Sequence, residues 1–413
     1  MEQGFFRVVS RAGFLDLLRR FPAVDAQRLP ISRAFGRVLA EDVAAPEDLP
    51  LADRSCMDGF AVRAADLFGA GEGSPVQLAR VADVAVEAFP EFTLAPGQCA
   101  WIPTGGCLPA GADAVIMVEF SEALAAGTVE MRKAVAPGEN VMRRGEDAKS
   151  GEPALRAGTR LRAQEIGLLA ALGVTEAAVS ARPRAVILST GDEVRPVEAR
   201  IGPGQVRDVN SHALSCLIEE AGGEPKARGI VADELDALVA AIKAALAESD
   251  LVLLSGGSSV GVRDLTMQAL GRFPDSEVLA HGVAMSPGKP TILARVGGKP
   301  FLGLPGQIAS AQVVMLVLGR PLVRHLCGDR AAFDELLRPM RRAELSRNLA
   351  SKHGREDYVR VRLESRPGRP PLAVPVLGKS GLLRTLLDCQ GLIAVPADLE
   401  GLYAGSEVDV WLI

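Results

Sequence analysis

The segment between residues 183 and 328 constrains the fold most, because it alternates buried-strand patterns with helical ones. Near-continuous apolar runs occur at 185–190 (AVILST) and 250–257 (DLVLLSGG). Strands that are apolar along their whole length must be covered on both faces, which is typical of parallel sheets in α/β proteins. The pattern therefore predicts a parallel α/β sheet. Apolar residues at helical spacing predict its helices at 211–221, 233–249, 265–273 and 308–325.

The chain of 413 residues is too long for a single hydrophobic core, so further domains are expected. Residues 11–21 have the spacing of an amphipathic helix, with Ser10 as its expected N-cap. Between 43 and 145, short apolar runs separated by Pro and Gly predict a mostly β region. After residue 329 the pattern predicts a small β domain. Its expected strands are 359–365, 372–377, 391–396 and 407–413.

Composition argues against several kinds of partner. The chain has 46 basic and 51 acidic side chains, and its net charge of -5 offers no general attraction to nucleic acid or an anionic membrane. Its longest apolar stretch, 308–318, is too short to span a bilayer. Its first residues lack the pattern of a signal or transit peptide. The six cysteines include no CxxC pair and the four histidines no HExxH pair, so we expect a reducing cytoplasm and no zinc site.

Three loops follow strands of the predicted sheet: 189–193 (STGDE), 255–261 (SGGSSVG) and 303–310 (GLPGQIAS). In open parallel sheets, ligands bind beyond the carboxyl ends of the strands, where free N–H groups attract anions. Each loop alone is also explained as a tight turn without a ligand, and Asp192 and Glu193 alone as a solvated turn. Three such loops at one edge favour a shared site, in which the two carboxylates suit Mg²⁺ or a nucleotide hydroxyl.

Lys289 stands in SPGKP (286–290) between residues of restricted conformation, so its ammonium would be presented to a tetrahedral oxyanion with little freedom. A lone lysine is otherwise an ordinary surface charge. Arg355 in GREDY and Ser380 in GKSG belong to the C-terminal β region. They complete an anion pocket only if that region folds back on the α/β domain, which spacing alone leaves open.

The mostly β region holds a second set of polar motifs. RSCMDGFAVR (54–63) contains Asp58, PTGG contains Thr104, and GENVMRRGED (138–147) ends at Asp147. Aspartate also favours turns, because its carboxylate bonds to nearby backbone groups. The residues alone leave a catalytic role and a turn-forming role about level.

Taken together, these motifs resemble the MoeA family, which includes the E domain of gephyrin. The resemblance covers nearly the whole chain in ten ordered motifs: SCMDGFAV, PTGG with LPAGADAVIMVE, GENVMRRGED, LSTGDEV, GQVRDVNS, LSGGSSVG, PGKP, GLPG, GREDYVRV and GKSG. One glycine-rich motif would be weak, whereas this order is specific. The resemblance implies a Mg²⁺-dependent molybdopterin molybdenumtransferase, which inserts molybdate into adenylylated molybdopterin and releases AMP.

The resemblance also implies an elongated homodimer with its active site between protomers. The implied parts are a linker domain (1–45 and 148–182), a mostly β insertion (46–147), a MogA-like α/β domain (183–328) and a C-terminal β-barrel (329–413). The implied catalytic residues are Asp58, Thr104, Asp147, Glu193 and Asp264, and the implied metal ligands are Glu193, Asp233 and Asp264. The implied substrate-binding residues are Ser255, Gly256, Gly257, Ser258, Ser259, Gly261, Lys289, Pro290, Ser310, Arg355 and Ser380.

Two positions depart from the family pattern. Ser286 stands directly before PGK, where a second lysine is common, and Gln307 follows GLPG, where Asn or His is usual. Loss of one cation weakens the electrostatic capture of molybdate, although His281 or Arg263 could compensate. A tungstate-preferring homologue therefore stays open.

The sequence also bears on three other functions. A molybdopterin adenylyltransferase would share the α/β domain, but the flanking β domains argue against it. A non-catalytic scaffold need not retain convergent carboxylates and a cation. A nucleotide-dependent oxidoreductase lacks support, because no GxGxxG follows a first strand. The expected partners are a second copy of the chain, a molybdopterin adenylyltransferase and molybdoenzymes.

Overall fold

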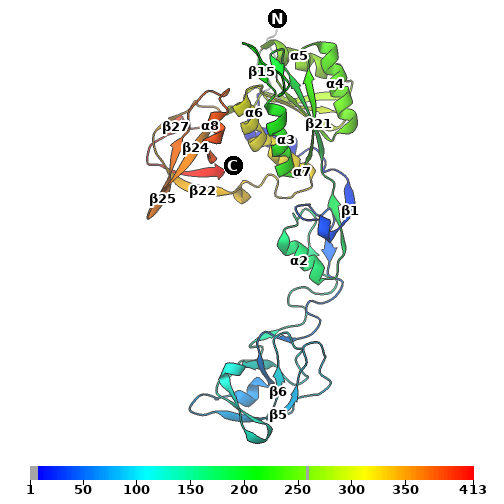
Figure 1. The fold of residues 1–413 in the computed structure, drawn as a ribbon, viewed down its shortest axis with the longest axis vertical. Coiled ribbons are helices and arrows are strands. Elements are labelled where there is room, and N and C mark those ends of the chain that lie inside the picture. The colour runs from blue at the N-terminus through cyan, green and yellow to red at the C-terminus, as the bar shows by residue number, and fades with distance from the viewer. Residues whose placement is uncertain (1–7, 257–259) are drawn as a thin grey trace.

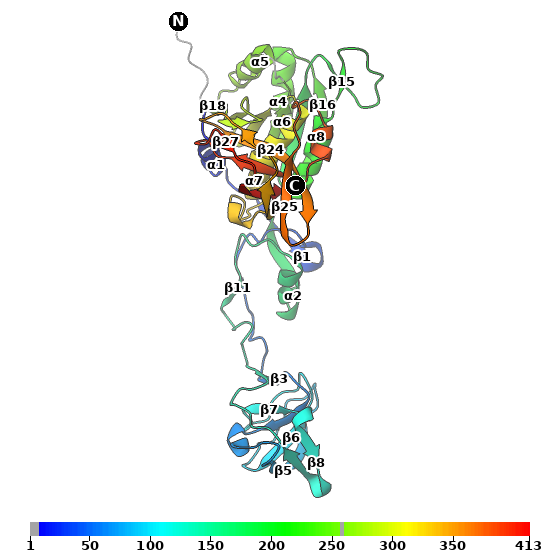
Figure 2. The same ribbon diagram turned by 90° about the vertical axis from the view of Figure 1, so that its left-hand side faces the viewer.

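A computed structural model describes residues 8–256 and 260–413 and shows an elongated molecule (Figure 1). The α/β domain and the C-terminal barrel lie side by side at one end. A small domain that contains β1 (Ala26–Pro30) and α2 (Ala163–Ala171) lies in the middle, and a mostly β domain lies at the far end of two thin connecting segments (Figure 2). Among the described helices, none has the length and apolar character that a membrane crossing needs.

The α/β domain contains a six-stranded sheet in the order β16-β13-β17-β21-β20-β18. Its strands are β13 (Arg184–Thr190), β16 (Glu224–Val231), β17 (Leu251–Ser255), β18 (Ser276–His281), β20 (Ile292–Val296) and β21 (Lys299–Leu304). The first four strands in this order are parallel, as predicted, whereas β20 and β18 add an antiparallel edge. That edge exists because Gly297 and Gly298 both take positive φ and form a tight hairpin turn between β20 and β21.

Helices cover both faces of this sheet, which explains why its strands are apolar throughout. The helices are α3 (Asn210–Ala221), α4 (Leu235–Glu248), α5 (Val260–Leu270), α6 (Ile308–Val314) and α7 (Arg320–Leu326). Ile187 and Leu253 pack in one core with α3, α6 and α7. Val186 and Val252, their neighbours along the strands, pack in a second core with α4 and α5. The prediction of a doubly covered α/β sheet is confirmed.

The long helix predicted over 308–325 is present but not regular. A π-helical segment (Met315–Gly319) joins α6 to α7. Pro321 follows in the first turn of α7, where it lacks the N–H that a continuous α-helix would direct to the carbonyl of Val317. The wider π turn accommodates this missing bond without ending the helix.

The C-terminal barrel is closed by five strands in the order β24-β25-β22-β28-β26, with β26 pairing back to β24. The strands are β22 (Met340–Leu345), β24 (Glu356–Arg366), β25 (Arg369–Pro375), β26 (Gly391–Val395) and β28 (Glu407–Leu412). β22 was not predicted, because only Ala343 and Leu345 are buried in its arginine-rich sequence. A short strand of the α/β domain, β19 (Met285–Ser286), pairs with β24 and joins the two domains.

The N-terminal segment contributes to two regions. Helix α1 (Arg11–Leu18) begins at the predicted N-cap, where the Ser10 hydroxyl accepts a hydrogen bond from the Gly13 N–H at 3.1 Å. Its apolar side chains belong to the core of the α/β domain. The chain then passes through the middle domain, where β1 pairs with β12 (Glu176–Ser180). The linker-domain limits stay a prediction, but α1 packs with the α/β domain.

The far domain is a six-stranded sheet in the order β7-β4-β6-β5-β9-β8. Its strands are β4 (Gly59–Val62), β5 (Val76–Asp83), β6 (Gln98–Ile102), β7 (Ala114–Met117), β8 (Ser121–Ala123) and β9 (Thr128–Met131). The chain enters and leaves side by side, since β2 (Val43–Ala44) pairs with β11 (Pro153–Leu155) and β3 (Arg54–Ser55) with β10 (Val141–Met142). This region is therefore an insertion into the middle domain.

Candidate active site

A pocket of about 230 Å³ lies at the carboxyl ends of β13, β17 and β21. All three loops that follow these strands contribute to its wall, so the sheet edge brings them together. Their lining residues are Ser189, Thr190, Glu193, Ser255, Gly256, Gly306, Gln307 and Ile308. Gly256 has a φ of 153°, and a Cβ there would lie 2.3 Å from the Thr190 carbonyl oxygen. A glycine is needed for the two strand ends to approach this closely.

The N-terminus of α3 adds a further wall, from Asp208 and Asn210. The Asn210 side chain donates one hydrogen bond to the Ser255 hydroxyl at 2.7 Å and another to the Gly306 carbonyl at 2.9 Å. Asn210 therefore ties two of the loops to α3. These bonds fix the distance between the loops before any ligand binds.

Two buried polar atoms of this pocket find no hydrogen-bond partner within residues 8–256 and 260–413. They are the Oγ of Ser189, a residue that is 3% exposed, and the Oδ1 of Asn210, which is 8% exposed. An unsatisfied buried polar atom costs about 1–3 kcal/mol. Such atoms are expected where a ligand supplies the missing partner, so the pocket is polar where a bound molecule would contact it.

The C-terminal barrel folds back on the α/β domain and closes one side of the pocket. Gly381, in the loop after β25, is one of the lining residues. Next to it, the Ser380 carbonyl accepts a hydrogen bond at 2.9 Å from the Ala309 N–H, in the first turn of α6. A free N–H at a helix start is thereby used to hold the barrel against the α/β domain.

Arg360 of β24 holds the same loop from the outer face of the barrel, opposite the face that Val359 and Val361 turn to the barrel core. Its side chain is buried, and it donates hydrogen bonds to the Gly378 carbonyl at 3.0 Å and to the hydroxyl of Thr385 in α8 (Arg384–Leu387). Burial lowers the pKa of this guanidinium, and no ion pair with a carboxylate is present among the described residues. A charge that is buried against neutral acceptors is costly, and the two hydrogen bonds to the loop offset part of this cost.

The segments that carry Lys289 and Arg355 are joined by the pairing of β19 with β24, where Ser286 lies opposite Asp357. Lys289 is exposed, and its backbone carbonyl accepts a hydrogen bond from the Val283 N–H at 3.0 Å. The Arg355 Nε lies 2.9 Å from the Asp357 Oδ1, in an ion pair that already offsets part of its charge. Lys289 is thus the cation of this corner with the greater capacity to attract an anion.

The two remaining residues predicted for molybdate lie close to this corner. Pro290 lines a narrow cavity together with Gly256, and Ser310 is buried in α6. Gly288, next to Lys289, packs against α6 so tightly that a Cβ would lie 2.5 Å from the Val314 Cγ2. The loop with Lys289 therefore packs against the last residue of α6, whereas Ser310 lies in the first turn of that helix.

The three predicted metal ligands, Glu193, Asp233 and Asp264, do not form a cluster in the described structure. The Asp233 carboxylate accepts a hydrogen bond from the Thr190 hydroxyl, Glu193 lies at the pocket wall, and Asp264 is exposed on α5. Among the described residues, no three His, Cys, Asp or Glu side chains are grouped to hold a metal. Gly261 lies in the first turn of α5. The other predicted loop positions, Gly257, Ser258 and Ser259, lie outside the described residues.

Family comparisons cover almost all of this architecture. Residues 10–173 match the MoeA N-terminal region (domain I and II), residues 186–325 match a probable molybdopterin binding domain, and residues 342–413 match the MoeA C-terminal region (domain IV). The molybdopterin molybdenumtransferase 2 of Mycobacterium tuberculosis is 34% identical over 387 residues, which cover 93% of this chain and 94% of the relative. The chain belongs to the MoeA family.

Two further MoeA relatives show the same extent of similarity. The molybdopterin molybdenumtransferase of Bacillus subtilis is 32% identical over 94% of this chain and 90% of its own length. The crystal structure of a molybdopterin biosynthesis MoeA protein from Pyrococcus horikoshii OT3 superposes with a TM-score of 0.82 at 29% identity, over 98% of this chain and all of the other. The similarity therefore includes the insertion and the barrel, which confirms the fold predicted from the MoeA resemblance.

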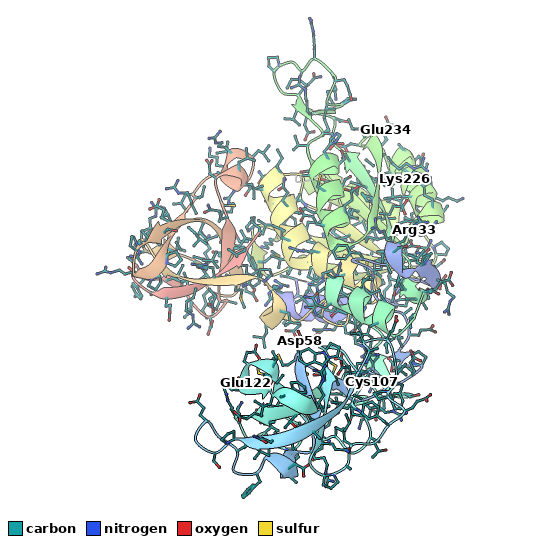
Figure 3. The ribbon with its side chains drawn as sticks, turned by 60° about the horizontal axis from the view of Figure 1, so that its bottom comes forward. Arg33, Asp58, Cys107, Glu122, Lys226 and Glu234 are labelled. Carbon is teal, nitrogen blue, oxygen red and sulfur yellow. The ribbon has the colours of Figure 1, made fainter. Side chains whose placement is uncertain are left out.

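The residues that the MoeA resemblance assigned to the insertion lie far from the pocket. Asp58 is labelled in the mostly β domain in Figure 3, and none of the lining residues of the pocket comes from this domain. The Asp58 carboxylate accepts a hydrogen bond from the Thr104 N–H at 2.7 Å, and this bond lowers the pKa of Asp58. Asp147 is exposed, and its N–H donates to the Leu49 carbonyl at 3.0 Å. Within one chain, these residues do not join the α/β loops.

Asp208, Asn210 and Arg360 were not singled out from the sequence. Asp208 and Asn210 lie in the MoeA motif GQVRDVNS, at the start of the predicted helix over 211–221, so their place at the same sheet edge was a usable signal. Arg360 lies inside a strand whose neighbours alternate between apolar and charged residues. Nothing in that pattern distinguishes it from an arginine at the surface.

Proposed function

We propose that this chain inserts molybdate into adenylylated molybdopterin, forming molybdenum cofactor and releasing AMP. Membership of the MoeA family makes the chain a transferase of molybdenum cofactor biosynthesis. The finer assignment rests on one observation: the pocket at the sheet edge combines unpartnered buried polar atoms of Ser189 and Asn210 with a neighbouring lysine loop. These features suit a phosphate-bearing ligand beside a small oxyanion.

In this proposal the sheet edge holds the pterin and adenylate. Ser255 and Gly256 begin the loop that would carry them, together with Gly257, Ser258, Ser259 and Gly261, because glycine lets backbone amides approach a phosphate closely. Asn210 keeps this loop in place through its bond to Ser255. Asp208, a buried carboxylate at the same wall, would bind donor groups of the ligand.

Molybdate would bind beside the adenylate, near Lys289, Pro290, Ser310, Arg355 and Ser380. Lys289 supplies a positive charge to the dianion, and the hydroxyls supply hydrogen-bond donors. An oxygen of molybdate would then attack the adenylyl phosphorus. The phosphoanhydride bond breaks, AMP leaves with that oxygen, and the dithiolate sulfurs take up molybdenum.

Magnesium is compatible with the carboxylates present. Mg²⁺ is usually bound by one or two carboxylates together with substrate phosphates, so the lack of a three-carboxylate cluster among the described residues does not oppose it. Glu193 or Asp233 would serve as ligand at the pocket, with Asp264 on α5 as a further candidate. The ion would offset the charge of the phosphoanhydride.

We further propose that the site is completed by a second copy of the chain. The insertion that carries Asp58, Thr104 and Asp147 lies at the end of an elongated molecule (Figure 1), and none of its residues lines the pocket of its own chain. A homodimer would bring them to the partner's pocket. The substrate then comes from a molybdopterin adenylyltransferase in the cytoplasm, and molybdoenzymes receive the product.

The test is incubation of purified chain with adenylylated molybdopterin, magnesium and molybdate, with AMP release and active cofactor measured together. We expect AMP only when an oxyanion is present, and about a hundredfold lower rate for Lys289→Gln. Lys243→Gln, an exposed lysine on α4, is the matched control and should behave as wild type. AMP release without oxyanion, or equal rates for both variants, would contradict the proposal. A tungstate arm measures the metal preference.

A further inference from the structure

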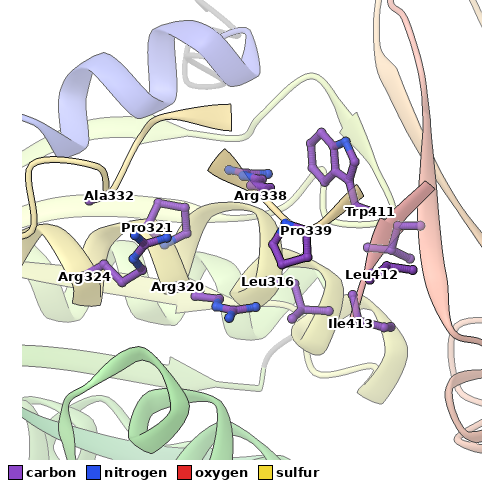
Figure 4. Close-up of a pocket in the computed structure, with 11 residues that line it drawn as sticks. Leu316, Arg320, Pro321, Arg324, Ala332, Arg338, Pro339, Trp411, Leu412 and Ile413 are labelled. Atoms are coloured by element: carbon purple, nitrogen blue, oxygen red, sulfur yellow. The ribbon is translucent and has the colours of Figure 1, made fainter. Parts of the chain in front are cut away.

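A second, smaller cavity of about 60 Å³ lies between α7 and the barrel (Figure 4). Arginines dominate its polar lining: Arg320 and Arg324 come from α7, and Arg338 comes from the segment that leads into β22. The apolar side includes Trp411 at the end of β28. None of its lining residues is shared with the candidate active-site pocket.

Only one carboxylate is engaged with the arginines on the α7 side, within the described part of the chain. Asp329, which is 4% exposed, accepts from the Arg324 Nε at 2.9 Å and lies 2.8 Å from its Nη2. The Nε of Arg160 lies 3.5 Å from the same oxygen. Asp329 is thus already shared by two guanidinium groups and has little capacity to neutralise a third.

The side chain of Arg320 makes no hydrogen bond and no ion pair with any residue in 8–256 or 260–413. Burial lowers its pKa; the negative charge of Glu220 opposes this, while the positive charges of Arg324 and Arg160 add to it. An arginine remains protonated at neutral pH despite such a shift. Arg320 therefore presents a positive charge to the cavity that no ion pair neutralises within the described residues.

Arg338 is in a similar position on the opposite wall. Its Nη2 is buried without a hydrogen-bond partner among the described residues, and its guanidinium stacks on the Trp411 ring at 4.4 Å. The nearest carboxylate, Glu335, lies 3.6 Å away and already binds Arg11 through both of its oxygens. Burial lowers the pKa of Arg338 as well.

These two half-buried guanidinium groups repel each other and lose hydration; Arg320 has no ion pair within the described residues, and Arg338 shares Glu335 with Arg11. A planar guanidinium binds oxyanions through paired N–H donors, so one shared anion would satisfy both groups. The cavity is far smaller than the several hundred Å³ typical of nucleotide or drug-sized ligands. It has room for a few waters or one small ion.

We propose that Arg320 and Arg338 bind one small tetrahedral oxyanion of the phosphate or sulfate class. The bound ion would link α7 of the α/β domain to the segment that enters the barrel. It would therefore stabilise the barrel in the position that delivers Gly381 to the candidate active site. This site is independent of the molybdate position proposed at Lys289.

The experiment is calorimetric titration of the full chain with sodium phosphate at 25 °C, at constant ionic strength against sodium chloride. We expect saturable binding that weakens at least tenfold in Arg320→Gln and in Arg338→Gln, because each removes one charged pair of donors. Arg320→Lys should recover part of the affinity. Parallel titrations with sulfate and molybdate identify which oxyanion is preferred.

Two control variants separate this site from other surfaces. Arg342→Gln changes an exposed arginine of β22 that is paired with Asp409 and Glu407, and Lys289→Gln changes the proposed molybdate corner. Both should bind phosphate as wild type does. The proposal fails if wild type shows no saturable binding, if both pocket variants keep full affinity, or if Lys289→Gln alone abolishes binding.

A melting experiment adds a second readout. In phosphate-free buffer, Arg320→Gln should melt at or above the wild-type temperature, because it removes a buried charge without a partner. In phosphate, the wild type alone should gain stability. A variant that melts lower in both buffers and gains as much from phosphate as wild type would show a purely structural arginine and overturn the assignment.

Discussion

The two regions that carry the proposed site differ in how far one chain completes them. The pocket of the α/β domain is closed by loops from three strands, the start of α3 and the barrel loop with Gly381. Two of its buried polar atoms have no hydrogen-bond partner among the described residues. The insertion presents exposed Asp58 and Asp147, and the Asp58 carboxylate is positioned by hydrogen bonds from Thr104. In the proposed dimer, one chain would therefore supply the ligand-binding half of each site and the insertion of the partner would supply the other half.

Complementation between two defective variants tests this comparison with the largest expected effect. Lys289→Gln alters the pocket half and Asp58→Ala alters the insertion half, so each alone should lose about a hundredfold in rate. When the two are unfolded together and refolded as a mixture, half of the dimers pair unlike chains, and each such dimer has one intact site. Activity should return to roughly a quarter of the wild-type value.

The same experiment has a clear contrary result. If both halves of a site came from one chain, the mixture would contain no intact site and would remain as inactive as its components. Each variant refolded alone serves as the control for recovery from denaturant. A mixture at the level of its parts would remove the proposed role of the insertion across the dimer.

A smaller effect is expected from the barrel loop, which belongs to the pocket half but comes from another domain. Arg360→Met removes the bonds to Gly378 and Thr385 while keeping an apolar stem of similar length. We expect roughly a tenfold lower kcat/KM for molybdate, because a displaced loop misplaces Ser380 and Gly381. Steady-state rates at varied molybdate, with the adenylylated substrate saturating, measure this change.

A positioning role for Arg360 makes two further demands. Arg360→Lys should restore part of the rate, since an ammonium reaches one of the two acceptors. The KM for the adenylylated pterin should change less than the KM for molybdate. Equal losses for both substrates, with a lower melting temperature, would instead indicate a general defect of the barrel.

The contrast between the regions also explains what could be predicted from sequence. The apolar runs ending at Thr190 and Ser255 determined the sheet, because burial on both faces leaves few other folds for such strands. The antiparallel edge depends on the Gly297-Gly298 turn. This local feature is not part of the strand-helix-strand pattern that predicted the parallel strands. β22 was not predicted, because its few buried residues are covered only when the barrel closes. The local sequence pattern does not show that closure.

For the candidate site, loop positions could be predicted and contacts could not. Strand ends identify where Ser189 and Gly256 lie, since parallel strands end at one edge. The docking of Ser380 on Ala309 depends on how two domains pack, which sequence spacing does not contain. Arg360 has the pattern of a surface arginine, and only its burial and its bonds to Gly378 and Thr385 show that it supports the loop.

Asn210 allows a test within the pocket half alone. In Asn210→Asp a carboxylate replaces the donor that reaches the Ser255 hydroxyl and the Gly306 carbonyl. The added negative charge would face a phosphate-bearing substrate, so the KM for adenylylated molybdopterin should rise about tenfold. Ser215→Ala, which removes only a bond within α3 to the Ser211 carbonyl, is the control. An unchanged KM would place the substrate outside this pocket.

The smallest expected effect concerns Ser286, the position directly before PGK at which the family resemblance implied a second lysine. Ser286→Lys would place a second ammonium near Lys289, on the segment paired with Asp357. Because Arg355 is already partly neutralised by Asp357, an added charge should tighten molybdate binding by about threefold, the scale of a solvent-exposed ion pair. The gain should fall as salt is raised, whereas binding of the adenylylated pterin should not change. Equilibrium dialysis with molybdate and tungstate measures the gain in affinity and its dependence on salt.

An equal gain in phosphate affinity at the pocket of Arg320 and Arg338 would mean that Ser286→Lys acts through the overall charge of the chain. That result would contradict a molybdate site at Lys289.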